Sequence, residues 1–128
     1  MRLILVRHAH SDSGDPDELR PLSARGREEA RALGERLAVE QPDAVVSSPL
    51  LRARETAAAI AKAAGIELRI DERLAPGANA DDVIAAAEGV GETVVTVGHQ
   101  PDCSEVVLAL EGSDPGFPPA GSYALDVS

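Results

Sequence analysis

The chain has 128 residues, 44% of them hydrophobic but only 2% aromatic, which predicts a single domain over residues 1–128 with an aliphatic core. Its formal net charge of −10 and its shortage of aromatic side chains argue against nucleic acid as a partner, because such partners are held by cationic and stacking residues. Cys103 is the only cysteine, which excludes an internal disulfide and a cysteine-rich zinc site, and we expect it to be a small buried residue.

The amino terminus has no charged segment leading into an apolar stretch of roughly 7–15 residues, as a secretory signal would require. The sequence also contains no run of about 20 apolar residues. We therefore expect a cytoplasmic protein without a membrane partner.

The chain opens with a predicted strand and helix. Residues 3–6 form a continuous aliphatic run, which is typical of a strand covered on both faces. A helix is expected over 24–39, because its apolar residues share one face while Arg and Glu side chains cover the other. The apolar face consists of Ala30, Leu33, Gly34 and Leu37.

A second helix is expected shortly after a second strand, residues 44–46. Ser48 can cap this helix, and Pro49 suits its first turn. The helical pattern continues to Ala64, and Gly65 is expected to end it.

The second half of the chain continues the alternation of strands and helices. Asn79 is expected to cap a helix whose early aspartates suit the positive end of the helix dipole. The Pro- and Gly-rich residues 112–121 are expected to form a loop before the last strand. The remaining predicted elements are strands over 66–70, 93–97 and 123–127 and helices over 81–88 and 104–110. This order, without internal repeats, predicts an α/β fold.

Polar side chains follow three of the predicted strands. Arg7 and His8 come directly after the first strand. Arg52 lies in the first turn of the second helix, and His99 follows the strand over 93–97. Ligands of open parallel sheets bind beyond the carboxyl ends of the strands, so all four side chains are expected in one crevice. Because helical side chains lean toward the amino terminus of their helix, Arg52 is expected to lean back toward the strand ends.

Two arginines and two histidines at a helix start are typical of an anion-binding site. Phosphate fits such a site, because a guanidinium group matches its oxygens with paired hydrogen bonds. An imidazole is partly neutral near pH 7 and can attack phosphorus, which forms a covalent phosphohistidine. The neighbouring cations then stabilise the charge on the phosphoryl oxygens, and the scheme requires no metal ion or other cofactor.

Three motifs in this order resemble the signatures of the histidine phosphatase superfamily, also called phosphoglycerate mutase-like. They are Arg7-His8-Ala9, the segment Ser48-Pro49-Leu50-Leu51-Arg52-Ala53-Arg54-Glu55-Thr56, and Gly98-His99. The short length and the segments Arg20-Pro21-Leu22-Ser23 and Arg25-Gly26 resemble the small SixA-type branch, the phosphohistidine phosphatases.

The resemblance implies a role for each motif residue and an architecture for the whole chain. By this resemblance His8 is the nucleophile, and Arg7, Arg52 and His99 hold the phosphoryl group. The implied fold is histidine phosphatase-like, with a mostly parallel sheet of about five strands, one of them running the other way, flanked by helices.

The chain departs from the family pattern at two places. Ala9 stands where the family commonly has glycine, and a side chain this small still lets a phosphate approach. The chain is also too short for the long insertion that many relatives place over the site, with a carboxylate in or near it that protonates the leaving oxygen. The candidates for such an acid here are Glu72, Asp12 and Asp17. The simpler interpretation of Glu72 is an exposed carboxylate after a strand, and residues 9–18 are expected to form a mobile loop near the site entrance.

Two further residues have alternative interpretations. Arg20 either binds the substrate or forms a structural salt bridge. His10 is either a third functional imidazole beside the site or a half-exposed histidine that turns away from it.

The absence of a strong candidate acid bears on the substrate. A phosphoramidate needs less help at the leaving atom than an alkyl phosphate, because imidazole departs as a neutral amine once its ring nitrogen is protonated. The leading hypothesis is therefore a phosphatase that removes phosphoryl groups from phosphohistidine on a partner protein and releases inorganic phosphate. The alternatives are a phosphomonoesterase of the same mechanism acting on a small phosphate ester, and a weakly catalytic phosphate-binding regulatory module.

Overall fold

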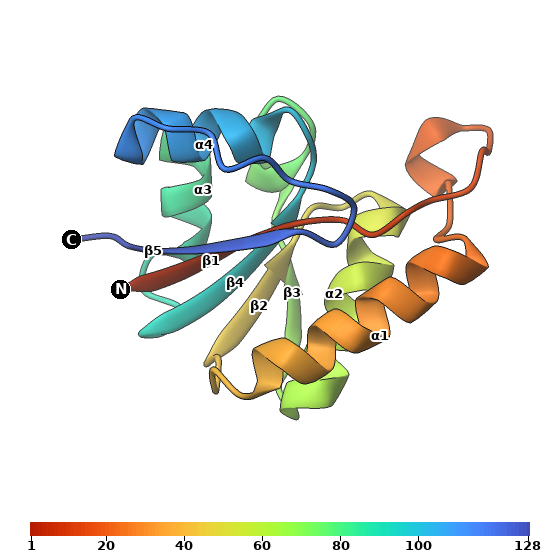
Figure 1. The fold of residues 1–128 in the computed structure, drawn as a ribbon, viewed down its shortest axis with the longest axis horizontal. Coiled ribbons are helices and arrows are strands. Elements are labelled where there is room, and N and C mark those ends of the chain that lie inside the picture. The colour runs from red at the N-terminus through yellow and green to blue at the C-terminus, as the bar shows by residue number, and fades with distance from the viewer.

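The computed structural model of the chain describes residues 1–128 and is built around one five-stranded sheet (Figure 1). The strands lie in the order β3-β2-β4-β1-β5, and only β5 runs antiparallel to its neighbour. Their bounds are Arg2–Arg7 for β1, Ala44–Ser47 for β2, Leu68–Ile70 for β3, Thr93–Gly98 for β4 and Ser122–Asp126 for β5. The predicted fold class, a mostly parallel sheet of an α/β protein, is confirmed.

Two helices cover each face of the sheet (Figure 1). The helices α1 (Ala24–Ala38) and α2 (Leu51–Ala64) pack on one face, and α3 (Ala80–Ala87) and α4 (Asp102–Glu111) on the other. Short 3₁₀ helices, η1 (Asp17–Leu19) and η2 (Glu72–Leu74), lie in the connections. None of the helices combines the length and the apolar composition that crossing a membrane requires.

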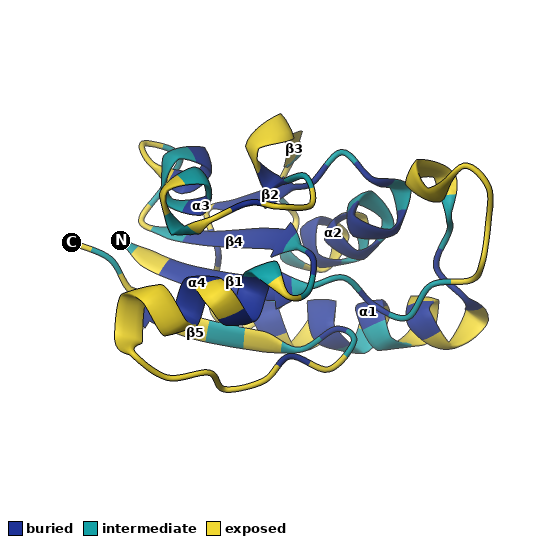
Figure 2. Ribbon diagram, turned by 90° about the horizontal axis from the view of Figure 1, so that it is seen from above, coloured by how far each residue is buried: buried dark blue, intermediate teal, exposed yellow.

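The aliphatic run of β1 is buried on both sides because each face of the sheet carries its own core. Leu3 and Leu5 pack in the cluster that α3 and α4 complete, whereas Ile4 and Val6 pack in the cluster under α1 and α2. All four side chains are at most 2% exposed. Figure 2 shows the same arrangement as a buried centre with exposed outer sides of the helices. This two-sided burial explains why β1 reads as a continuous hydrophobic run instead of an alternating one.

Most of the predicted helix ends are confirmed. Ser23 caps α1 by accepting a hydrogen bond from the amide of Gly26 at 3.0 Å. Asn79 caps α3 and forms a reciprocal capping box with Asp82. Gly65 ends α2 in the left-handed conformation, with φ of 70°, which glycine adopts without steric cost.

The predicted start of α2 is wrong by two residues. The helix begins at Leu51 with the extended Leu50 as its N-cap residue, and no side chain caps it. Ser48 lies outside the helix, where its hydroxyl contacts His99 and accepts a hydrogen bond from the amide of Leu50. Pro49 is therefore also outside the first turn.

Two other boundaries differ from the prediction. The strand β3 is shorter than the expected 66–70, because the amide of Ile66 bonds back to Ala61 and completes the end of α2. The helix α4 begins two residues earlier than the expected 104, at Asp102.

Candidate active site

The carboxyl ends of three neighbouring strands place the predicted site residues side by side. The central strand β4 pairs with β1 on one side and with β2 on the other. Backbone hydrogen bonds continue past these strands, from the His8 amide to Gly98 and from the Ser48 amide to Val97, both at 3.0 Å. The backbone hydrogen bonds of the sheet thus hold the residues that directly follow β1 and β2 in place.

A pocket of about 380 Å³ opens at these strand ends. It is lined by Arg7, His8, Ala9, His10, Ser11, Arg20, Arg52, Pro76, His99, Gln100 and Pro119. All five residues expected to bind or act on a phosphoryl group are in this set, and no carboxylate is. The structure contains no cluster of three or more His, Cys, Asp or Glu side chains able to hold a metal ion.

His8 is held in one defined orientation. Its Nδ1 lies 2.7 Å from the main-chain oxygen of Ala9. A carbonyl oxygen can only accept, so Nδ1 carries the proton and Nε2 keeps its lone pair. Burial, together with the nearby Arg52 and Arg7 guanidinium groups, lowers the pKa of His8 to about 4. The hydrogen bond to the Ala9 carbonyl acts in the opposite direction and raises the pKa, but by less. The ring is therefore neutral near pH 7, with a nucleophilic nitrogen.

Thr56 holds Ala9, the residue whose carbonyl orients His8. The amide of Ala9 donates to Thr56 Oγ1 at 3.0 Å, and the hydroxyl donates to the main-chain oxygen of Arg52 at 2.8 Å. Both Ala9 and Thr56 are fully buried. The hydroxyl thus links the turn after β1 to the first turn of α2.

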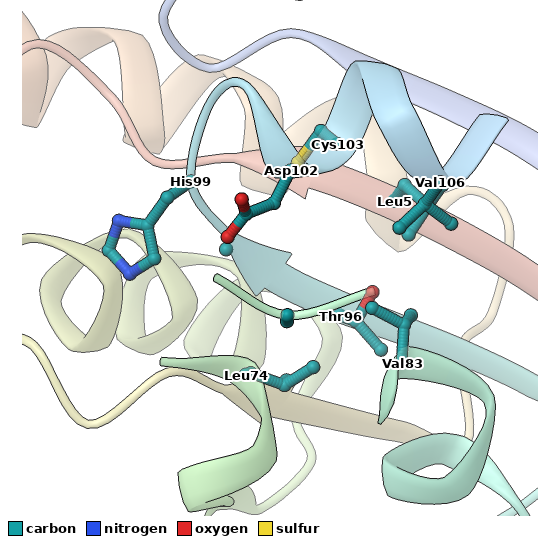
Figure 3. A pocket seen from close by; sticks show the side chains of 10 residues that line it. Leu5, Leu74, Val83, Thr96, His99, Asp102, Cys103 and Val106 are labelled. Carbon is teal, nitrogen blue, oxygen red and sulfur yellow. The ribbon is translucent and has the colours of Figure 1, made fainter. Parts of the chain in front are cut away.

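His99 lies beside His8, with the two ring centroids 5.3 Å apart and the planes tilted by 58°. Its Nε2 is 2.7 Å from the hydroxyl oxygen of Ser48. Burial, with His8 and Arg52 nearby, lowers the pKa of His99 to about 4. The ring extends away from the apolar side chains that line a small cavity of about 20 Å³ behind it, among them Leu74 and Val83 (Figure 3).

Two buried side-chain nitrogens have no hydrogen-bond partner: Nδ1 of His99 and Nε of Arg7. The other end of Arg7 is anchored, because its NH1 donates to the main-chain oxygen of Phe117 at 2.9 Å. Buried polar atoms are rarely left unpaired in a protein. Both of these atoms belong to residues that line the same pocket.

Arg52 leans from α2 to the pocket as predicted, and Asp17 contacts it there. Its NH1 donates to the main-chain oxygen of Asp17 at 2.9 Å, and its NH2 lies 3.2 Å from Asp17 Oδ2. The other carboxylate oxygen accepts from Arg20 NH1 at 3.1 Å. Hydrogen bonds from Arg20 and Arg52 hold the pKa of Asp17 below its ordinary value, so this carboxylate is ionised near neutral pH.

The three carboxylates considered as general acids are not placed alike. Glu72 is exposed in η2 and does not line the pocket, which agrees with its interpretation as a surface carboxylate. Asp12 is exposed, and only its main-chain oxygen reaches a pocket residue, accepting from Arg20 Nε. Asp17 alone touches the pocket arginines through its carboxylate.

Arg20 and His10 both line the pocket and also make structural contacts outside it. Arg20 lines the pocket and also forms the ion pair with Asp17. His10 lines the pocket while its Nδ1 lies 2.7 Å from the hydroxyl of Ser23, the cap of α1. Cys103 is buried as expected, and burial raises the pKa of its thiol to about 12.

Sequence reasoning missed the contacts made by Ser48, Thr56 and Asp17. Ser48 was expected to cap a helix, but its hydroxyl contacts His99 instead. The position of Thr56 four residues after Arg52 is a usable signal, because a helical threonine can bond back to that carbonyl. Nothing in the sequence pairs Asp17 with Arg52, which lies 35 residues further on.

The sequence matches known proteins over just over half of its length. Residues 3–76 match the profile of the histidine phosphatase superfamily (branch 1). Phosphoserine phosphatase 1 of Hydrogenobacter thermophilus is 39% identical over an alignment of 83 residues that covers 58% of this chain and 37% of that protein. Glucosyl-3-phosphoglycerate phosphatase of Mycobacterium tuberculosis is 36% identical over an alignment of 78 residues that covers 57% of this chain and 35% of that protein. The chain thus spans little more than a third of the length of these relatives.

Solved structures match almost the whole chain. The protein histidine phosphatase SixA in complex with tungstate has a TM-score of 0.87 at 23% identity and covers 99% of this chain and 88% of its own. A protein of Agrobacterium tumefaciens assigned to the SixA phosphohistidine phosphatases has a TM-score of 0.83 at 28% identity, covering 98% and 90%. The matched motifs, the pocket at the strand ends and the shared fold lead to one conclusion: the chain belongs to branch 1 of the histidine phosphatase superfamily.

Proposed function

We propose that residues 1–128 form a single catalytic domain that acts as a phosphatase through a covalent phosphohistidine on His8. The observation that carries this proposal is the hydrogen bond from His8 Nδ1 to the Ala9 carbonyl, which leaves a neutral Nε2 as the only available nucleophile of that ring. It lies in a pocket lined by three arginines, Arg7, Arg20 and Arg52. A binding pocket for phosphate would need the cations but no nucleophile fixed in this way.

In the first step the lone pair of His8 Nε2 attacks phosphorus. The bond from phosphorus to the leaving atom breaks, and its electron pair stays on that atom, which takes a proton from solvent. Arg52 and Arg7 stabilise the charge on the transferred oxygens, and Nδ1 of His99 and Nε of Arg7 gain the acceptors they lack. No metal ion takes part in this sequence of steps.

In the second step water attacks phosphorus and the bond to Nε2 breaks, which releases inorganic phosphate and restores neutral His8. Because Nδ1 keeps its proton in the intermediate, the phosphorylated ring carries a positive charge that the Ala9 carbonyl oxygen stabilises. A cationic ring is a better leaving group than a neutral one would be. The same contact therefore serves both steps.

We propose phosphohistidine on a partner protein as the substrate. No carboxylate lines the pocket, and Asp17, the only carboxylate on its arginines, is ionised and cannot act as an acid near neutral pH. An imidazole leaving group needs less protonation by the enzyme than an alkoxide does. The similarity to SixA structures over nearly the whole chain also favours this substrate class.

A second candidate is a phosphomonoesterase that acts on small esters. The observation in its favour is the sequence similarity of residues 3–76 and their neighbours to proteins named phosphoserine and glucosyl-3-phosphoglycerate phosphatases. Such substrates leave as alkoxides and would need a proton donor, either Asp17 once a substrate displaces it from Arg52 or solvent.

The test compares phosphate release from a phosphohistidine-bearing phosphotransfer protein with release from an aryl phosphate and from phosphoserine. Wild type is measured beside His8→Ala and beside Arg54→Lys, a control in the same helix whose Nε donates only to the Pro49 carbonyl. We expect His8-dependent turnover that favours the phosphohistidine protein, with Arg54→Lys close to wild type. Turnover of the esters alone would favour the second candidate, and phosphate binding without any turnover would reject both.

A further inference from the structure

Ser48 and His99 are buried side chains in contact, and a partner can be assigned or excluded for each of their hydrogen-bonding atoms. The Ser48 hydroxyl oxygen accepts from the Leu50 amide at 3.2 Å and lies 2.7 Å from His99 Nε2. It has no other partner, and Ser48 is fully buried. His99 is 4% exposed, and its Nδ1 has no partner in the protein.

Only one proton arrangement satisfies this pair. A hydroxyl has one proton, and the single acceptor within its reach is Nε2 of His99. If Nε2 carried a proton instead, the Ser48 hydroxyl would be a buried donor without an acceptor, which is destabilising. The buried Nδ1 would then also be an acceptor without a donor, among the arginines and imidazoles of an anion pocket.

We infer that Ser48 is a positioning residue that donates to Nε2 of His99 and thereby fixes His99 as the tautomer with its proton on Nδ1. This inference rests on the proposed phosphatase function for its consequence in catalysis, but not for the tautomer itself. His99 then presents an N–H donor, from a ring that stays neutral, to the oxygen of a bound phosphoryl group.

The same arrangement assigns different roles to the two neighbouring imidazoles. Both rings carry their proton on Nδ1, but the free lone pair of His8 lies on Nε2, whereas that of His99 is occupied by Ser48. His99 therefore cannot compete as a nucleophile, although its ring centroid is only 5.3 Å from that of His8. Ser48 thus makes one histidine a donor while the Ala9 carbonyl makes the other a nucleophile.

The first measurement is the ¹⁵N spectrum of the histidine rings, whose two-bond couplings distinguish the tautomers. The chain has only three histidines, so the signals are assigned from His10→Gln and His99→Gln variants. We expect the Nδ1–H tautomer for His99 in the wild type. In Ser48→Ala we expect His99 to adopt the Nε2–H tautomer or a mixture of the two tautomers. The matched control is Ser47→Ala, which removes an equally buried hydroxyl that donates to the Ser48 carbonyl and does not contact His99.

The second measurement is turnover of an aryl phosphate by the same variants. We expect kcat of Ser48→Ala to fall about tenfold or more with a smaller change in KM, because a donor aligned in the transition state is lost. Ser48→Thr, which restores a hydroxyl, should recover the tautomer and most of kcat, and Ser47→Ala should retain both.

Each outcome bears on one of the two proposals. Finding His99 as the Nε2–H tautomer in the wild type overturns the inference, and so does a Ser48→Ala protein whose tautomer or kcat is unchanged. A wild type with the expected tautomer but no activity toward either the aryl phosphate or a phosphohistidine-bearing protein leaves the Ser48 assignment standing and rejects the proposed function instead.

Discussion

Asp17 and Arg52 are joined by two hydrogen bonds, through the main-chain oxygen at 2.9 Å and the carboxylate at 3.2 Å. The Arg52 side chain is 8% exposed, whereas that of Asp17 is 59% exposed. A surface carboxylate thus already binds the Arg52 guanidinium group, which we propose binds the phosphoryl oxygens of the substrate. Asp17 and a phosphate dianion would compete for the same donors and repel each other.

Replacing Asp17 with asparagine should therefore strengthen the binding of inorganic phosphate. The amide side chain is nearly isosteric with the carboxylate and leaves the main-chain contact to Arg52 available, but it removes the competing negative charge. We expect the inhibition constant for phosphate to fall several-fold, and the difference to shrink at high salt because the carboxylate is exposed. Unchanged or weaker inhibition at low salt would show that Asp17 does not compete for the site.

Replacing Thr56 with Val should destabilise the protein and impair catalysis together. The buried amide of Ala9 loses its acceptor, which costs about 1–3 kcal/mol of unfolding free energy, measured by urea denaturation. The matched control is Thr96→Val, at a threonine that is also buried but whose hydroxyl makes no hydrogen bond to the protein. Equal losses in the two variants would mean that the Thr56–Ala9 bond has no special role.

Replacing Arg52 with Lys should lower kcat/KM even though the positive charge is kept. An ammonium group lacks the planar fork of donors that matches a phosphoryl group. Loss of one such donor typically costs about 10²–10³ in rate. Steady-state kinetics beside Arg54→Lys test this, and activities that differ by less than a few-fold between the two variants would contradict the assignment.

The pH dependence of kcat/KM should report the pKa of His8 in the free protein, which burial and the nearby arginines lower to about 4. Protonation at Nε2 removes the nucleophile, so activity is lost as the pH falls through this value. After correction for ionisation of the substrate, we expect kcat/KM to stay level from pH 7 to about 5 and to fall below that. An acid limb centred near 6.5, the ordinary value for histidine, would mean that His8 is not perturbed in this way.

The sequence predicted those parts of the molecule that follow from local pattern and from parallel-sheet topology. The aliphatic run of β1 and the strand over 93–97 lie side by side, so Arg7, His8 and His99 meet where the sheet ends. The parts that were missed depend on contacts between distant segments. Asp17 reaches Arg52 and Ser48 reaches His99 only after the chain has folded, and no periodicity or capping rule encodes such pairs.

The start of α2 shows why one of these misses was unavoidable. A serine followed by proline before a helical pattern is a standard N-cap signal. Here the serine hydroxyl is used by His99, so the helix begins later and without a side-chain cap. Local preference was overridden by a requirement of the site.

The most direct test of the account is the position of the phosphoryl group in a trapped intermediate. Wild type and His8→Ala are mixed with a ³²P-labelled substrate, quenched in base, where phosphohistidine survives, and analysed by mass spectrometry and ³¹P NMR. We predict one phosphoryl group on Nε2 of His8 in the wild type and no labelled protein for His8→Ala. A phosphoryl group on Nδ1, on His99 or on His10, or full turnover by His8→Ala, would contradict it.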